Sequence, residues 1–227
     1  MNRRALVLST ALLVLVVFGV AGFIYNDSSS RGAATSSQIA AADQQVSSVQ
    51  SSEALVRPHS PVLGPREAPV TIVEFFDPSC EACRAFYPVV KQVMARYPRE
   101  VRLVIRYAPL HVGSEEAVRI LETARLQGVY VPVLEAVLAS QPEWHNGDMA
   151  SAWSAAEAAG LDRARARAAL QSPQINSVLQ ADFADLQTLG VKGTPTFFVN
   201  GKLLTDFGEQ QFRELVRAAV DNTGRRQ

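Results

Sequence analysis

Residues 70–84 read VTIVEFFDPSCEACR, and this stretch decides the fold. Its first seven residues are mostly β-branched or aromatic and predict a buried strand, which the following Asp-Pro-Ser ends. From Cys80 to about residue 97, apolar side chains recur at helical spacing, and Pro88 predicts a kink inside this helix. Residues 101–107 alternate and predict a second strand. A strand, a helix and a strand in this order predict a parallel βαβ unit.

The rest of the chain predicts a helical insert followed by a hairpin and a closing helix. Residues 114–190 carry no strand pattern and read as four or five short helices. Residues 196–207 predict two strands joined by a turn at Asn200 and Gly201. Residues 209–221 form an amphipathic pattern typical of a helix. The fold class is therefore α/β, in the order βαβ, helical insert, ββα.

Both cysteines of the chain lie in one motif, Cys80-Glu-Ala-Cys83, at the first turn of the predicted helix. Unpaired N–H groups and the helix dipole favour an anion there, so the Cys80 thiolate is stabilised. The spacing of three residues places the second sulfur close enough to form a disulfide with the first. A disulfide this short stabilises a fold weakly, so a reversible redox pair is favoured over a structural bridge. A metal-ligand pair is a third alternative, although His59, His111 and His145 have no metal-binding spacing.

The N-terminal region has the composition of an export segment. Residues 5–25 are almost entirely apolar and follow Arg3 and Arg4, so residues 1–25 predict an uncleaved signal anchor, that is, a single transmembrane helix. A cleaved signal peptide is the alternative. Residues 26–57 are rich in serine and alanine and predict a linker, although a heptad-like pattern in residues 35–56 leaves an oligomerising helix open. The exported domain is expected to span residues 58–222.

Composition excludes several classes of protein. The chain has 227 residues, 48% of them hydrophobic, which is ample for a packed core. It has 22 basic and 22 acidic side chains, and this balance argues against nucleic-acid binding. Two cysteines exclude a disulfide-stapled mini-protein and a four-cysteine zinc site.

Two motifs together carry a resemblance to a known family. Residues 75–84, FFDPSCEACR, are followed about 110 residues later by GTPTFFVNG at residues 193–201. In this order, on either side of a helical insert, they resemble the DsbA-like branch of the thioredoxin superfamily, over roughly residues 60–222. The resemblance implies a thioredoxin fold with an inserted helical domain, and thiol–disulfide exchange on cysteines of other exported proteins.

The resemblance also implies roles for individual residues. Cys80 would be the exposed nucleophile and Cys83 the buried resolving cysteine. Pro195 would be the cis-proline beside them, and Gly193 and Thr194 would offer backbone groups to an extended substrate segment. Glu74, on the first strand, would move the proton of Cys83.

Two further residues carry weaker expectations. Arg106 on the second strand is a candidate ion partner of Glu74, against the alternative of an ordinary strand charge. His111 follows the second strand, and the geometry of the family could bring this region toward the active site.

The sequence departs from the strong oxidases of the family between the cysteines. Those proteins carry a proline and a histidine where this chain has Glu81 and Ala82. An anionic Glu81 should oppose the thiolate, so we expect a less oxidising couple and leave the oxidase, reductase and isomerase directions open. We expect catalysis without a metal or organic cofactor, in a periplasmic domain held at the inner membrane and coupled to a membrane redox partner. A non-catalytic chaperone or metal-binding module on the same fold is the rival interpretation.

Overall fold

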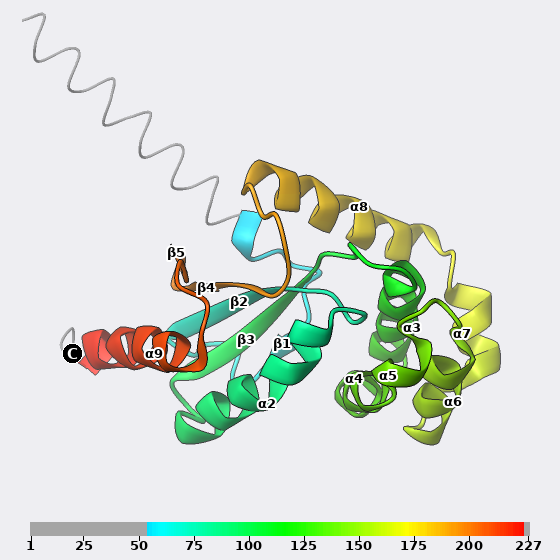
Figure 1. Cartoon of the computed structure of the whole chain (residues 1–227), viewed down its shortest axis with the longest axis horizontal. Helices are drawn as coiled ribbons and strands as arrows, with labels where there is room; N and C mark the ends of the chain where they lie inside the picture. Colours follow the sequence, from blue (N-terminus) through cyan, green and yellow to red (C-terminus); the bar gives the residue numbers. More distant parts are fainter. Residues whose placement is uncertain (1–53, 225–227) are drawn as a thin grey trace, which may run out of the picture. The chain divides into compact units, whose positions relative to one another are not determined.

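The structure is a computed structural model, and it describes residues 54–224. Figure 1 shows a central sheet with helices on both faces and a separate group of helices at one end. The strands are β1 (Val62–Leu63), β2 (Val70–Phe76), β3 (Val101–Tyr107), β4 (Thr196–Val199) and β5 (Lys202–Leu203). The helices are α2 (Glu81–Arg96), α3 (Ser114–Leu126), α4 (Tyr130–Ala139), α5 (Gln141–Trp144), α6 (Ala150–Ala158), α7 (Arg163–Ala169), α8 (Pro173–Thr188) and α9 (Glu209–Gly224).

The sheet has the strand order β1-β3-β2-β4-β5. Strands β2 and β3 are parallel, as the βαβ pattern predicted, and their register pairs Glu74 with Ile105. Strand β4 runs antiparallel to β2 and forms a hairpin with β5. Asn200 and Gly201 at the hairpin turn have positive φ angles of 46° and 82°, which confirms the predicted turn. Strand β1 was not predicted, because two residues are too few to show a periodicity.

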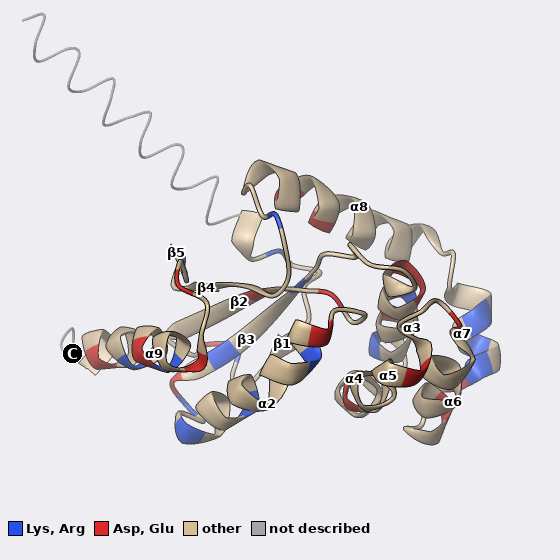
Figure 2. Cartoon of the chain, viewed as in Figure 1, with Lys and Arg blue, Asp and Glu red and all other residues tan. Residues whose placement is uncertain are grey.

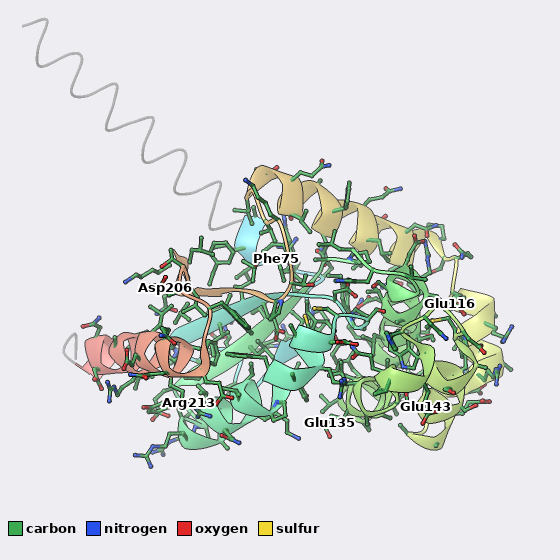
Figure 3. The ribbon with its side chains drawn as sticks, viewed as in Figure 1. Phe75, Glu116, Glu135, Glu143, Asp206 and Arg213 are labelled. Carbon is green, nitrogen blue, oxygen red and sulfur yellow. The ribbon has the colours of Figure 1, made fainter. Side chains whose placement is uncertain are left out.

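One face of the sheet is covered by α2 and α9. Alternate residues of β2 point to this face, and Ile72 and Phe76 pack there with Phe86 of α2 and Phe212 of α9. The helices also contact each other at their surface, where Arg213 of α9 donates to Gln92 of α2 at 2.7 Å (Figure 3). Burial of this face fixes the start of α2, and with it both cysteines, at the end of β2.

The opposite face is covered by α8 and by the first described residues of the chain. Leu55, Val73, Phe75 and Leu186 share a second apolar cluster there. Residues 54 and 55 are helical and buried. The packed domain therefore begins before residue 58, where the linker was expected to end, because the last residues of that linker cover apolar side chains of the sheet.

A buried ionic network on this second face corrects the expectation for Arg106. Its guanidinium donates to Asp182 at 2.9 Å and to Asp185 at 2.6 Å, both on α8. Its ion partners are therefore these two aspartates and not Glu74. The physical reason is strand parity: Glu74 pairs with Ile105, and the next residue along β3 points to the other face of the sheet.

Six helices, α3 to α8, lie between β3 and β4, where four or five were expected. Helices α3 to α7 form the group at one end of the sheet in Figure 1, and α8 runs back from this group over the sheet. Trp144 is fully buried within this group, and its indole N–H donates to the carbonyl of Val137 at 3.0 Å. The insert also contacts α2, because Lys91 donates to Glu135 of α4 at 2.6 Å (Figure 3).

Within residues 54–224, no helix combines the length and the apolar character that a membrane span requires. The expected transmembrane helix, most of the expected linker and nearly all of the heptad-like segment fall outside the described residues.

Candidate redox site

Cys80 occupies the N-cap of α2, with φ −74° and ψ 120°. Its thiol donates to the carbonyl oxygen of Thr194 at 3.2 Å, which brings two distant segments of the sequence together. Hydrogen bonds to the sulfur lower the pKa of Cys80 to about 5. The largest contribution comes from the Cys83 thiol, and smaller ones come from the Thr194 side chain and the backbone N–H groups of Ala82 and Cys83. Partial burial of the sulfur opposes this effect. At neutral pH Cys80 is therefore an anion, as its place at a helix N-terminus predicted. The residue is only 5% exposed, whereas the resemblance implied an exposed position, because the start of α2 and the loop before β4 cover it.

Cys83 lies one turn further along α2 and behaves in the opposite way. It is fully buried, and both cysteines are free thiols. Burial raises the pKa of Cys83 far above the usual value, and the hydrogen bond to Cys80 and the charge of Glu74 act in the same direction. One sulfur of the pair is thus ionised and the other is held as a neutral thiol.

The loop before β4 faces Cys80 from the other side. The Thr194–Pro195 peptide bond is cis, as the resemblance implied. Among residues 54–224, the buried Thr194 hydroxyl has no hydrogen-bond partner. Gly193 is exposed, and its carbonyl accepts from the Thr196 hydroxyl at 2.7 Å. This loop brings Thr194 to the reacting sulfur and keeps Gly193 at the surface.

Glu74 lies on the side of the sheet that α2 covers. Its side chain is buried, and neither carboxylate oxygen has a hydrogen-bond partner among the described residues. Burial, with a smaller contribution from the charge of Cys80, raises the pKa of Glu74 to about 8. The charge of Glu74 also raises the pKa of Cys83, so the carboxyl and the buried thiol influence each other's protonation. A group that titrates near neutral pH in this position can exchange a proton with Cys83.

Asp77 and His111 form a further part of the site, in which His111 was a weak expectation from the sequence and Asp77 was not predicted. Asp77 follows β2 and is fully buried, and its carboxylate accepts from the His111 ring nitrogen Nδ1 at 2.7 Å. This bond is the largest contribution to a raised pKa of His111, and the charge of Cys80 adds to it. One sequence signal could have found the pair: β2 and β3 are parallel, so the residues that follow them meet at one edge of the sheet.

Gln141 of α5, which was not predicted, connects the helical insert to the cysteine motif. It is fully buried, and its amide nitrogen donates to the carbonyls of Pro78 at 2.7 Å and Cys80 at 3.0 Å. Its amide oxygen accepts from Arg84 at 2.7 Å. Gln141 therefore satisfies backbone groups on both sides of Ser79 and fixes the segment that leads into α2.

Glu81, between the cysteines, points into solvent. Figure 2 shows acidic positions at the end of β2 and at the start of α2. The Glu81 side chain is 71% exposed and lies 3.8 Å from the His145 ring. Water and this histidine weaken the effect of Glu81 on the thiolate.

Within residues 54–224, no group of three or more histidine, cysteine, aspartate or glutamate side chains is arranged to hold a metal ion. The described part of the site consists of two thiols, the buried carboxyls of Glu74 and Asp77, His111, Gln141 and the loop of the cis-proline.

Solved structures resemble this arrangement of elements. A thioredoxin-like oxidoreductase from Silicibacter pomeroyi DSS-3 is 32% identical, with a TM-score of 0.66 over 74% of this chain and 94% of that one. BdbD from Bacillus subtilis, in its oxidised form, is 22% identical, with a TM-score of 0.65 over 71% of this chain and 93% of that one. The second likeness concerns the fold alone.

Curated relatives match over a shorter stretch. The Na(+)/H(+) antiporter NhaA 3 of Salinispora tropica is 37% identical over 144 residues, which is 62% of this chain. The match covers 22% of the antiporter, so this chain corresponds to about a fifth of that protein.

A family model covers most of the described domain. The model described as Thioredoxin matches residues 57–221, from the segment before β1 to α9. This range contains both cysteines, the cis-proline loop and the whole helical insert. The chain belongs to this thioredoxin family.

Proposed function

We propose that the chain is a thiol–disulfide oxidoreductase that acts on cysteines of other exported proteins through Cys80 and Cys83. The observation that carries the proposal is the opposite ionisation of the two sulfurs. The pKa of Cys80 lies near 5, whereas that of buried Cys83 is strongly raised. A structural disulfide or a pair of metal ligands does not need this asymmetry, but sequential exchange does, because one sulfur must attack and leave while the other waits.

In the oxidising direction the reaction has two steps. A substrate thiolate attacks the Cys80 sulfur, the Cys80–Cys83 bond breaks, and Cys83 leaves as a thiolate. A second substrate thiolate then attacks the substrate sulfur of the mixed disulfide and releases Cys80 as a thiolate. The substrate loses two electrons, which the enzyme dithiol gains, and in the reverse direction Cys80 attacks a substrate disulfide and Cys83 resolves the adduct.

Glu74 supplies the proton that this cycle needs. With a pKa near 8, the carboxyl is mostly protonated at neutral pH and can neutralise Cys83 as that sulfur leaves. The proton passes directly or through one water. When Cys83 attacks in the reverse direction, the carboxylate takes the proton back.

The loop of residues 193–195 receives the substrate. Gly193 is exposed, and the Thr194 carbonyl lies at the Cys80 sulfur. An extended substrate segment can pair with this backbone as an added strand, which brings its cysteine to Cys80 without a sequence requirement.

The next part of the proposal concerns the cellular location of the chain and its redox partner. We propose that residues 1–25 hold the chain in the inner membrane, with the catalytic domain in the periplasm and a membrane protein as redox partner. A similar solved structure is a periplasmic thioredoxin-like protein from Salmonella enterica serovar Typhimurium, 22% identical. Antiport by the curated relatives does not carry over to this chain, because the matched segment is 22% of their length.

Two activity assays on the full chain test the proposal. The wild type should reduce insulin and oxidise a reduced model protein, and Cys80→Ser should do neither. Cys83→Ala is the matched control: it should attack a substrate disulfide but accumulate the mixed disulfide, because the resolving thiol is missing. Unchanged activity in Cys80→Ser would reject the proposal, whereas a wild type without either activity would favour a non-catalytic chaperone.

The direction and the assembly need separate measurements. Alkylation of thiols in intact cells should show Cys80 and Cys83 mostly as a disulfide in an oxidase and mostly as a dithiol in a reductase or isomerase. The oligomeric mass with and without residues 35–56 separates these last two, since the heptad-like segment would assemble an isomerase. A monomer in both cases would remove the isomerase alternative.

A further inference from the structure

A buried carboxylate ties His111 to the segment that leads into Cys80. One Asp77 oxygen accepts from the Ser79 N–H at 2.8 Å and from the Ser114 hydroxyl. The other accepts from the N–H groups of Leu110 at 2.8 Å and His111 at 3.1 Å, and from His111 Nδ1 at 2.7 Å. Both segments are therefore fixed to the same side chain, at the edge of the sheet where β2 and β3 end.

A further hydrogen bond joins the segment before Cys80 to the segment of His111. The Ser79 hydroxyl donates to the carbonyl of Val112 at 2.8 Å, so the residues flanking Cys80 and His111 are also joined directly. Asp77 accepts from His111 Nδ1, which therefore carries a proton, while the side chain remains 49% exposed and can gain a second proton from water. The imidazole is held in place but can still titrate.

The other charged groups around Cys80 do not provide a positive charge of this kind. Glu74, Asp77 and Glu81 are acidic. Arg84 donates to the buried Gln141 on the side of the helical insert, and His145 lies against Glu81. His111 binds Asp77, which also binds the Ser79 N–H next to Cys80, and the charge of Cys80 contributes to the raised pKa of His111.

We propose that His111, held by Asp77, is the cationic partner of the Cys80 thiolate and binds a proton more tightly when the active-site disulfide is reduced. His111, which follows β3, would thus take the role of the histidine that strong oxidases carry between their cysteines. This inference rests on the proposed function, because it takes Cys80 as the redox sulfur. His111 acts through Cys80 and is a positioning residue in this sense.

The charge that reduction creates at Cys80 explains why His111 should bind a proton more tightly in the reduced enzyme. Reduction breaks the Cys80–Cys83 bond with two electrons from a substrate dithiol, which becomes a disulfide. Of the two protons that the substrate dithiol loses, one goes to Cys83 and the other goes to His111 or to water, and Cys80 remains an anion. The new negative charge raises the proton affinity of the imidazole, and reciprocally a protonated imidazole stabilises the thiolate and so the reduced enzyme.

A titration of the wild-type full chain tests this coupling without any substitution. The ring resonances of His111 are followed by NMR as a function of pH in the disulfide and dithiol forms, and assigned by their absence in His111→Asn. We expect a higher pKa of His111 in the dithiol form than in the disulfide form. Equal His111 values in the two forms would overturn the proposal.

A matched pair of variants tests the effect on Cys80. His111→Asn retains a donor for Asp77 but removes the charge, and His145→Asn removes the histidine beside Glu81. The pH dependence of Cys80 alkylation should show its pKa rising by about half a unit in His111→Asn, since solvent screens a half-exposed charge. The equilibrium with glutathione should shift about threefold toward the disulfide.

The two variants must differ for the proposal to stand. His145→Asn should change both values by less than half as much, and an equal effect would show that any neighbouring histidine suffices. An unchanged Cys80 in folded His111→Asn would also refute it. These measurements need no protein substrate, so they remain decisive even if the wild type proves inactive in the insulin and oxidation assays.

Discussion

The Thr194 carbonyl accepts a hydrogen bond from the Cys80 thiol at 3.2 Å, across 114 residues of sequence. The same residue also reaches the sulfur through its side chain, which stabilises the thiolate. That hydroxyl is buried and, within the described residues, has no hydrogen-bond partner. Its effect on the pKa of Cys80 couples the cis-proline loop to the chemistry of the sulfur.

Substitution of Thr194 should change the redox equilibrium. Thr194→Val removes the hydroxyl donor, so we expect the pKa of Cys80 to rise by about half a unit to one unit and the equilibrium with glutathione to shift toward the disulfide. Thr194→Ser retains the hydroxyl and is the matched control, with a pKa close to that of the wild type. Alkylation rates measured against pH would decide; the same curve for all three proteins would show that the hydroxyl does not reach the thiolate.

Glu74 should make stability depend on pH. Its carboxyl has a pKa near 8 in the folded chain and an ordinary value of 4.5, so between these values the folded state binds more protons than the unfolded state. The free energy of unfolding that Glu74 contributes therefore falls as pH rises from about 4.5 through 8, and is unaffected below 4.5.

Two variants separate the charge from the burial of a polar group. Glu74→Gln cannot ionise and should match the wild type at pH near 4.5 but become more stable than it above 8. Glu74→Leu should also gain about 1–3 kcal/mol at low pH, because it removes an unpartnered buried group. Urea unfolding of the reduced proteins across this range provides the measurement, and a difference that does not vary with pH would contradict the raised pKa.

Local patterns predicted most of the elements, whereas contacts between distant segments came only from the structure. The β-branched run, the cysteines at a helix start and the Asn200-Gly201 turn are each determined within a few residues, and the structure has all three. The Thr194–Pro195 peptide was expected through the family resemblance, since these residues alone indicate only a turn.

The errors and omissions have a common physical cause. The partner of Arg106 depended on the register of β2 and β3, which decides the face of the sheet to which each side chain points. Asp77 binds His111, which lies 34 residues further along the sequence. The Pro78 carbonyl accepts from Gln141, which lies 63 residues further along. Hydrophobic periodicity carries no information about such polar contacts, because they form only after the helical insert has packed against the end of the sheet.

Loss of Gln141 should affect both the fold and the nucleophile. Gln141→Leu leaves the carbonyls of Pro78 and Cys80 buried without their donor, so we expect a loss of about 2 kcal/mol in the free energy of unfolding. The first turn of α2 also loses its support, and the pKa of Cys80 should rise. Gln210→Leu, at an exposed position of α9, is a control that should change neither quantity. A stability loss with an unchanged Cys80 would limit Gln141 to a structural role.

Arg106 should be far more important for stability than its neighbour on the same strand. Arg106→Met removes the buried cation between Asp182 and Asp185. Arg57 still pairs with Asp185 and His59 with Asp182, so we expect a loss of about 3 kcal/mol. Arg102→Met is the matched control: Arg102 donates to the Thr71 hydroxyl and to a backbone carbonyl near the surface, so we expect a loss below about 1 kcal/mol. Adding Asp182→Asn to Arg106→Met should recover part of the stability, because one buried negative charge is then removed. Equal losses for the two arginine variants in urea unfolding would show that the network on the α8 face does not depend on its central cation.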